Sequence, residues 1–392
     1  MYDPIRNVVN EIANVLALHI REEIELELRR PPRLWVRKWI ARRENLGASY
    51  RLLKEIAHED PAEYFGALRM TEDSFNHLLH LVTPAIQKSD TFMRCALPAK
   101  VKLHAILYML ATGCSLRTVQ HLFRIAKTTI SAILPETCDA VYDALKEYIQ
   151  VIKYFSNRRV DVKTTFKTPV QYTDNSNRYY YFNYKKQNST VLMAAVDHDY
   201  CFTYIDIGCN GRVSDGGVFS HCNLSNALEN DLLPEGHLFV GDNAFPLKKY
   251  LMKPYGGNNL THEQKIFNYR LSRARRIVEN AFGILVARFR IFEKPIPFEP
   301  NKVEKIVKAC CAIHNWARKS KIPIQVASID TEDTETGIIV NGDWRNVPSD
   351  GIVDIQWRIQ NRSSQTAQSI RNSYAAYFMG DGAVSWQERM IY

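Results

Sequence analysis

Residues 236–245 read GHLFVGDNAF, and this stretch decides the fold. The run Leu238, Phe239 and Val240 is short and wholly apolar, which predicts a strand buried on both faces of a sheet. Asp242 follows that run directly, and a residue at the carboxyl end of a buried strand faces solvent in an α/β fold. A turn aspartate is the alternative interpretation. A helical segment precedes the strand, so we expect it to run parallel to an earlier strand of the sheet.

Alternating apolar residues predict the other strands of this sheet. They span residues 160–166, 179–184, 190–196 and 202–207, and polar or glycine-containing turns separate them. Strands this short and this close together predict an antiparallel meander. Short helices are expected at 214–219 and 224–232, before the buried strand. The fold class is therefore α/β, with a mixed sheet.

A long helix follows the sheet and carries a second candidate carboxylate. Thr261, with Gln264 three residues later, forms a capping-box pattern that predicts a helix ending near residue 289. Glu279 lies on this helix at the seam between the apolar face and solvent. A carboxylate at such a seam is costly unless it is paired or bound to a metal. An ordinary helix pair with Arg275 or Arg276 is the alternative. A further helix is expected at 302–318.

The first 150 residues are predicted to be almost entirely helical. A helix at 100–111, a short helix after Ser115 and a helix from Lys127 have the order of a helix-turn-helix near residues 99–136. In such a unit the last helix lies in the DNA major groove, so Lys127, Thr128, Thr129 and Ser131 would face DNA, and Arg117 would contact a phosphate. Ile130, Ile133 and Leu134 would pack inward. A plain three-helix packing unit would show the same apolar spacing.

The composition fits a folded chain with an anionic partner. The 392 residues suggest two or three domains, and 51 Lys+Arg against 42 Asp+Glu give a net charge of +9. This balance favours nucleic acid as the partner. No apolar stretch is long enough for a membrane span, and the N-terminus lacks a secretion signal. The eight cysteines form no C-x-x-C pair, which gives little support to a zinc site or a disulfide framework.

The last part of the chain changes character. Residues 328–354 read SIDTEDTETGIIVNGDWRNVPSDGIVD, which is acidic and aperiodic and predicts a flexible loop or a disordered insert. A final helix is expected at 365–378. We infer a helical region at 1–150, an α/β region at 151–325 and an acidic segment with a C-terminal helix at 326–392.

Carboxylates on a strand end and a neighbouring helix, with a third from the first strand, are what a two-metal phosphoryl-transfer site requires. Their hard oxygen ligands suit Mg²⁺ or Mn²⁺, whereas Cys and His would select other metals. Asp242 and Glu279 are the candidates on the buried strand and the long helix.

Four segments resemble the PIF/Harbinger transposase-derived nuclease family. The segments are LFVGDNAFPL at 238–247, GRVSDGGVF at 211–219, LTHEQKIFNYRLSRARRIVENAFGIL at 260–285 and ACCAIHNWA at 309–317. The resemblance implies an RNase H-like catalytic domain, preceded by the helical domain, that cuts DNA with a divalent metal and an Asp-Asp-Glu triad. It implies that Asp242 is the Asp after the buried strand and that Glu279 is the Glu.

The first Asp of the triad departs from the family pattern. The family has Asp-Gly-Lys-His or Asp-Gly-Thr-His on the first strand, and this chain has neither. Asp161 lies on a predicted strand at roughly that place but lacks the Gly and the His. Either a segment has been lost or Asp161 is the substitute catalytic residue and metal ligand. Asp215 matches an acidic position of the family and is a further candidate ligand, with a helix N-cap as the alternative.

Two functions stay open at this point. One is a metal-dependent DNA endonuclease that hydrolyses phosphodiester bonds, and the other is a catalytically silent DNA-binding or adaptor protein with the same fold. Arg270, Arg273 and Arg276 recur every three residues on the Glu279 helix and either bind phosphates or form a solvated face. The resemblance implies a Myb-like DNA-binding partner and a nuclear location, while the cytoplasm and a homo-oligomer stay open.

Overall fold

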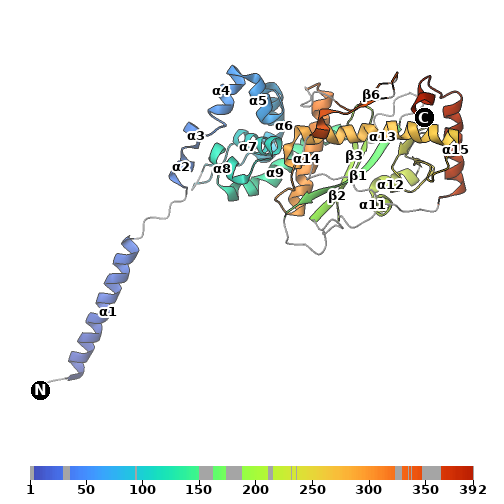
Figure 1. The fold of residues 1–392 in the computed structure, drawn as a ribbon. Coiled ribbons are helices and arrows are strands. Elements are labelled where there is room, and N and C mark those ends of the chain that lie inside the picture. Colours follow the sequence, from blue (N-terminus) through green and yellow to red (C-terminus); the bar gives the residue numbers. More distant parts are fainter. Residues whose placement is uncertain are drawn as a thin grey trace.

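The structure is a computed structural model that describes residues 4–29, 36–92, 95–149, 162–173, 188–210, 215–230, 232–234, 236–322, 329–333, 335–336, 338–346 and 363–391. Figure 1 shows three parts in chain order: the separate helix α1 (Pro4–Arg29), a group of helices, and a sheet with helices around it. None of the described helices combines the length and the apolar character that a bilayer span requires.

The helical region packs around α7 (Ala99–Thr112), which is buried on nearly all sides. The helices at 100–111 and 116–123 that the sequence predicts are α7 and α8. The other members of the region are α2 (Lys38–Ala41), α3 (Arg43–Leu46), α4 (Leu52–Glu59), α5 (Pro61–Leu68), α6 (Glu72–Ile86), α8 (Leu116–Phe123), α9 (Lys127–Leu145) and η1 (Lys146–Tyr148). Its apolar core is continuous with that of the sheet region, so the two regions pack as one body.

The sheet has five strands in the order β3-β2-β1-β4-β5. The strands are β1 (Val162–Tyr172), β2 (Asn188–Val196), β3 (Phe202–Asn210), β4 (Leu238–Val240) and β5 (Leu251–Met252). β1, β2 and β3 form the antiparallel meander, and β4 runs parallel to β1, as the sequence predicts. This order and these directions fit an RNase H-like fold. The predicted strand at 179–184 lies outside the described residues.

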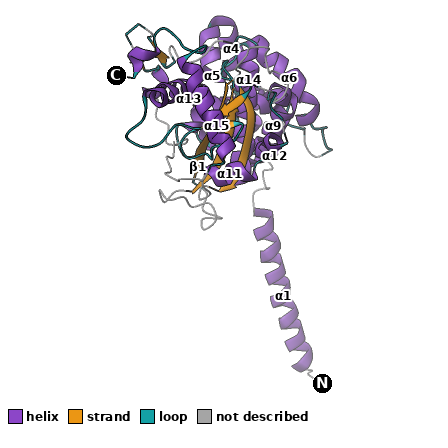
Figure 2. Ribbon diagram, turned by 90° about the vertical axis from the view of Figure 1, so that its right-hand side faces the viewer, coloured by secondary structure: helices purple, strands orange, loops and turns teal. Residues whose placement is uncertain are grey.

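Helices cover the sheet on both faces (Figures 1 and 2). Two short helices, α11 (Asp215–His221) and α12 (Asn223–Glu229), come between β3 and β4 in the chain. The long helix α13 (His262–Arg288) packs against β1, β2 and β4, and both hydrogen bonds of the predicted capping box at Thr261 and Gln264 are present. The helix α14 (Pro300–Lys319) follows η2 (Arg290–Phe292) and joins the two regions by packing against α9 and β3.

The acidic segment differs from its prediction as a flexible insert. Its described residues between 329 and 346, which we call the strap, form β6 (Thr331–Glu332), β7 (Ile339–Val340) and η3 (Asp343–Asn346). The strap lies against α13, and β6 pairs with β7. The predicted C-terminal helix is α15 (Gln365–Met379), and it packs on α13 before η4 (Gln387–Met390). Polar contacts to α13 hold the strap in place. Such contacts leave no apolar periodicity in the sequence, so the sequence did not predict that the strap is ordered.

Candidate functional site

Asp242 lies in a tight loop directly after β4. Its Oδ1 accepts a hydrogen bond from the Ala244 amide at 2.8 Å, so the carboxylate fixes the turn that it stands in. A Cβ on Gly241 would lie 3.1 Å from the Phe245 ring, and only glycine lets this ring close the loop so tightly. Asp242 is half-buried, and its position at the carboxyl end of β4 agrees with the prediction.

Glu279 lies on a half-buried flank of α13. Asn268, eleven residues earlier and therefore within about 20° on the helix surface, shares this flank. The Asn268 amide bonds the backbone of Tyr255, which lies three residues beyond the end of β5. β4 and β5 are parallel, so this flank faces the carboxyl ends of both strands. Glu279 lies about 16 Å further along this flank than Asn268.

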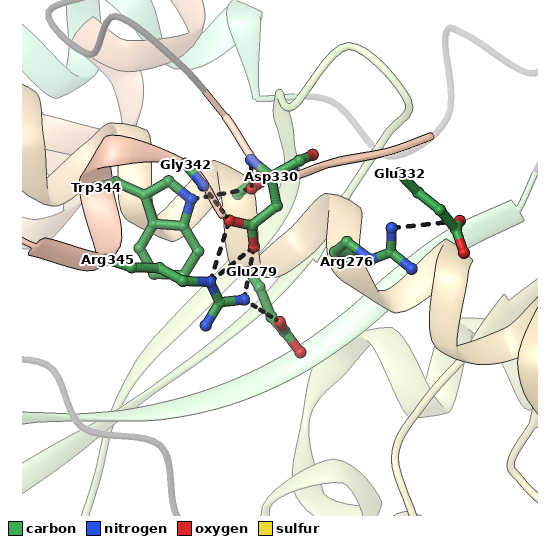
Figure 3. Close-up of polar contacts among 8 residues, drawn as sticks. Arg276, Glu279, Asp330, Glu332, Gly342, Trp344 and Arg345 are labelled. Atoms are coloured by element: carbon green, nitrogen blue, oxygen red, sulfur yellow. Dashed lines mark hydrogen bonds and ion pairs between the residues drawn. The ribbon is translucent and has the colours of Figure 1, made fainter. Parts of the chain in front are cut away.

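The Glu279 carboxylate has a cationic partner on the strap. Arg345 Nη2 lies 3.3 Å from Glu279 Oε2, and the same guanidinium donates to both carboxylate oxygens of Asp330 at 2.5 to 3.0 Å (Figure 3). The hydrogen bond to Asp330 raises the pKa of Arg345. Arg276, one of the two helix partners in the alternative interpretation of Glu279, pairs instead with Glu332 at 3.3 Å.

A buried polar network attaches the strap to α13. The Asn280 side chain donates to the Asp330 carbonyl at 3.1 Å and accepts from the Asp330 amide and from Trp344 Nε1 at 3.0 Å each. The Gly342 amide donates to Asp330 Oδ1 at 2.7 Å. A Cβ on Gly283 would lie 2.2 Å from the Trp344 ring, so the indole fits only over a glycine.

The residues at 279, 280 and 283 of α13 therefore form the docking surface of the strap. Sequence reasoning missed Asp330, Asn280, Trp344 and Arg345. The available signal was a tryptophan beside an arginine within an otherwise acidic stretch.

The third carboxylate of the expected triad is not on β1. Val162 pairs with Leu238 and Thr164 with Val240, where β4 ends two residues before Asp242. The strand reads VKTTFKTPVQY and contains no Asp or Glu. Asp161 lies outside the described residues. The next residue, Val162, is level with the start of β4, four residues or about 13 Å along the strands from Asp242.

Asp215 is the first residue of α11, one residue from the predicted helix start. Its side chain lies outside the described part of the structure. Within that part, no group of three or more His, Cys, Asp and Glu side chains is placed to hold a metal ion. The described residues therefore do not fit a two-metal centre, which needs several carboxylates around a pair of ions.

The three arginines of α13 make contacts within the chain. Arg273 and Arg276 both pair with Glu332, whose side chain is only 4% exposed. Arg270 donates to the Gly382 carbonyl and to Gln387, and its guanidinium lies 4.7 Å from the centre of a phenylalanine ring of α15. All three line a cavity of about 640 Å³ between β4, α13, the strap and α15. In this arrangement they hold the strap and the C-terminal segment on α13.

The candidate DNA-binding residues lie at the starts of α8 and α9. Arg117, Lys127 and Thr128 are exposed, and Ala126 leaves the first amides of α9 without a side-chain cap. The apolar residues predicted to pack inward, Ile130, Ile133 and Leu134, are buried. Further along α9, Ser131 contacts Lys302 of α14 at 3.2 Å. The exposed surface therefore belongs to the first turn of α9, and the rest of the helix joins the two regions.

Part of this chain is similar to known proteins. Residues 163–315 match the family described as DDE superfamily endonuclease. "Protein ALP1-like" of Arabidopsis thaliana is 29% identical over 144 residues, which are 33% of this chain and 36% of that protein. "Putative nuclease HARBI1" of Xenopus laevis is 28% identical over 119 residues, which are 29% of this chain and 33% of that protein. The matches thus span about a third of each relative. Residues 163–315 are therefore similar to DDE superfamily endonucleases, which confirms the resemblance to the PIF/Harbinger transposase-derived nucleases.

Proposed function

We propose that this chain binds DNA and keeps the fold of a DDE endonuclease without metal-dependent cleavage. The observation that carries the proposal is the composition of β1, the strand beside β4. The family resemblance implies an Asp on this strand next to Asp242. Here the strand has lysines at 163 and 167 and no acidic residue. Two carboxylates are too few to hold and neutralise a pair of divalent ions.

The contact between Arg345 and Glu279 supports the same proposal. A carboxylate that ligates a divalent ion must offer its oxygens to that ion. In this structure a guanidinium, held by the buried Asp330, lies beside the Glu279 carboxylate. The chain thus supplies its own counter-charge to the carboxylate that resembles the Glu of the family triad.

The DNA-binding part of the proposal rests on charge and on α8 and α9. The chain carries a net charge of +9. Arg117, Lys127 and Thr128 lie exposed at the starts of two helices joined by a short turn, the arrangement of a helix-turn-helix. Backbone amides at the uncapped start of α9 add hydrogen-bond donors for a phosphate. Arg273 and Arg276 contribute only if the strap leaves them, and Arg270 only if the C-terminal segment leaves it.

A metal-dependent endonuclease is the second candidate function. It is favoured by Asp242 at the carboxyl end of β4 and by Glu279 on α13, the elements on which the family triad has its second Asp and its Glu. Asp161 or Asp215 would then have to supply the missing carboxylate, with Mg²⁺ or Mn²⁺ as the ion. A Myb-like DNA-binding partner and a nuclear location, both implied by the family resemblance, accompany either function.

Duplex binding, with and without divalent metal, tests the proposal. The measurement is fluorescence anisotropy of a labelled DNA duplex, with parent protein and the Asp242→Asn variant, in EDTA and in Mg²⁺ or Mn²⁺. We expect the two proteins to bind equally tightly to each other in each buffer, to bind in EDTA without any metal, and to lose affinity as salt rises. Binding that needs the metal and fails in Asp242→Asn would favour the endonuclease. No duplex binding by either protein would refute the DNA-binding part.

A further inference from the structure

A lysine lies at the carboxyl ends of the parallel strands β4 and β5. Val240 of β4 pairs with Met252 of β5, so the two strands end level with each other. Lys253 follows β5 directly, and its Nζ donates to the Asn243 carbonyl of the neighbouring loop at 3.3 Å. In an open α/β sheet, ligands bind outside the carboxyl ends of the strands. The half-buried Lys253 therefore stands where a ligand of this fold is expected.

A second cation reaches the same place from α15. Arg371 Nη1 donates to the Pro254 carbonyl at 3.4 Å, and its guanidinium lies 3.8 Å from the centre of the Tyr255 ring. The Tyr255 hydroxyl donates to the Asn372 side chain at 2.7 Å, which ties the ring to the same helix. These contacts hold the guanidinium beside the two residues that follow Lys253.

The two cations are close enough to influence each other, and they lack an acidic partner. Burial, and then the charge of Arg371, lower the pKa of Lys253, while the charge of Asp242 opposes them. Neither cation forms an ion pair with a carboxylate in the part of the chain that the structure describes. Asp242 uses one oxygen for the Ala244 amide of its own loop. Two positive charges near one negative charge leave a net positive site, which suits an anion.

The loop that follows Tyr255 is open to solvent. Residues 256–259 read GGNN, and all four are exposed. A Cβ on Gly256 or Gly257 would meet no heavy atom within 4 Å, and Gly257 has a φ of +104°, which other residues rarely adopt. Without side chains at these two positions, the backbone of a ligand can approach closely. The site is therefore open on this side, as binding of a phosphate within a long polymer requires.

We propose that Lys253 and Arg371 bind one backbone phosphate of DNA at the carboxyl ends of β4 and β5, without a metal ion between phosphate and protein. The inference rests on the proposed function, in which the chain binds DNA without a complete metal centre. Lysine and guanidinium N–H groups donate charge-assisted hydrogen bonds to phosphate oxygens, and such bonds are roughly twice as strong as neutral ones. The two side chains supply positive charge where a two-metal site would use divalent ions.

Fluorescence anisotropy of a labelled DNA duplex, over a range of salt concentrations in EDTA, tests this site. Replacing Lys253 and Arg371 together, by Lys253→Gln and Arg371→Gln, should weaken duplex binding about tenfold. It should also lower the slope of log affinity against log salt by about 0.9, the value for one phosphate. Lys248→Gln is the matched control, because Lys248 precedes the same strand at its amino end and pairs with Glu229. This control should change neither the affinity nor the slope.

A charge-keeping variant separates a phosphate contact from a packing effect. Lys253→Arg with Arg371→Lys alters the same two positions but keeps both positive charges, so it should keep the slope of the parent. An equal loss of slope in the charge-keeping and the glutamine variants would show that the two side chains act through packing, and would overturn the inference.

The outcomes also separate this site from the proposed function. A parent that binds the duplex, with an unchanged slope in the double glutamine variant, overturns this inference and leaves DNA binding standing. A parent that binds no duplex overturns both. Mg²⁺ at constant ionic strength should not restore the affinity of the double glutamine variant, because side chains hold the phosphate. Full restoration by Mg²⁺ would assign this role to a metal ion and overturn the inference.

Discussion

Replacing Arg345 with alanine removes the cation between the strap and α13. In the parent, the Asp330 carboxylate is fully buried and accepts from Arg345 and from the Gly342 amide. Without the guanidinium, one backbone amide remains to compensate a buried negative charge. The Glu279 carboxylate, by contrast, keeps access to water, because its side chain is 33% exposed. Loss of the contact between Arg345 and Asp330 should therefore destabilise the fold much more than loss of the contact between Arg345 and Glu279.

The structure sets the magnitudes. Removing one partner of a buried ion pair costs about 3–5 kcal/mol, and we expect the lower end, about 3 kcal/mol, because the Arg345 side chain is 39% exposed. Losing the contact between Arg345 and Glu279 costs only about 0.2–1 kcal/mol, as exposed pairs do. Glu279→Gln removes the second contact alone and is the matched control.

Native-state hydrogen exchange of the strap measures this difference. The Asp330 amide donates to Asn280 of α13 and exchanges when the strap leaves this helix, whereas the Gly342 amide donates to Asp330 Oδ1 and exchanges when that contact within the strap opens. We expect Arg345→Ala to lower their protection about a hundredfold and Glu279→Gln to lower it less than about fivefold. Equal, small losses in the two variants would refute the reasoning, since the buried carboxylate would then not depend on Arg345.

Three further predictions concern the strap, DNA binding and acid stability. Gly283→Ala should lower the free energy of unfolding by about 1–3 kcal/mol and make the strap sensitive to limited proteolysis, because the added Cβ would overlap the indole of Trp344. Gly66→Ala is the control and should lose no stability, because its Cβ has room. Equal proteolysis of the two variants would contradict this prediction. Lys127→Ala should reduce the slope of log affinity against log salt for duplex binding by about 0.9. Lys146→Ala is the control: it removes an exposed lysine paired with an aspartate and should leave the slope unchanged. An unchanged slope in Lys127→Ala would show that Lys127 is not in the interface. Burial, and then the charge of a neighbouring lysine, lower the pKa of His104 from 6.5 to about 3. The unfolded state therefore binds the proton first, and the free energy of unfolding should fall by up to about 1.4 kcal/mol per pH unit as the pH drops below 6.5. His104→Gln should lack this part of the pH dependence, and an unaltered pH profile of stability would contradict the prediction.

Local signals in the sequence predicted the elements that position the site. The capping box at Thr261 marks the start of α13, and the apolar run at 238–240 marks β4 with Asp242 after it. Both signals depend on residues within a few positions of each other. The parallel direction of β4 also followed from the sequence, because a helical connection precedes the strand.

The contacts made by the strap could not be predicted in this way. Arg345 and Glu279 are 66 residues apart, and the Asn280 amide bonds Asp330 across 50 residues. Acidic residues in an aperiodic stretch are typical of solvated loops, so the full burial of Asp330 is visible only once α13 is in place. The register of β1 is a second example. The sequence places a strand near residues 160–166, but only the pairing with β4 shows that Thr164 stands level with Val240, two residues before Asp242.

Nicking of supercoiled plasmid DNA, in Mg²⁺ and in Mn²⁺, tests most directly whether the nuclease centre is incomplete. The parent chain is compared with Asp242→Asn, which replaces a carboxylate by an amide of the same shape and so removes the ligand charge. With no carboxylate on β1 beside Asp242, the account predicts that both proteins bind the plasmid and that neither nicks it above the rate in buffer. Metal-dependent nicking by the parent that Asp242→Asn abolishes would contradict the account and establish a working endonuclease.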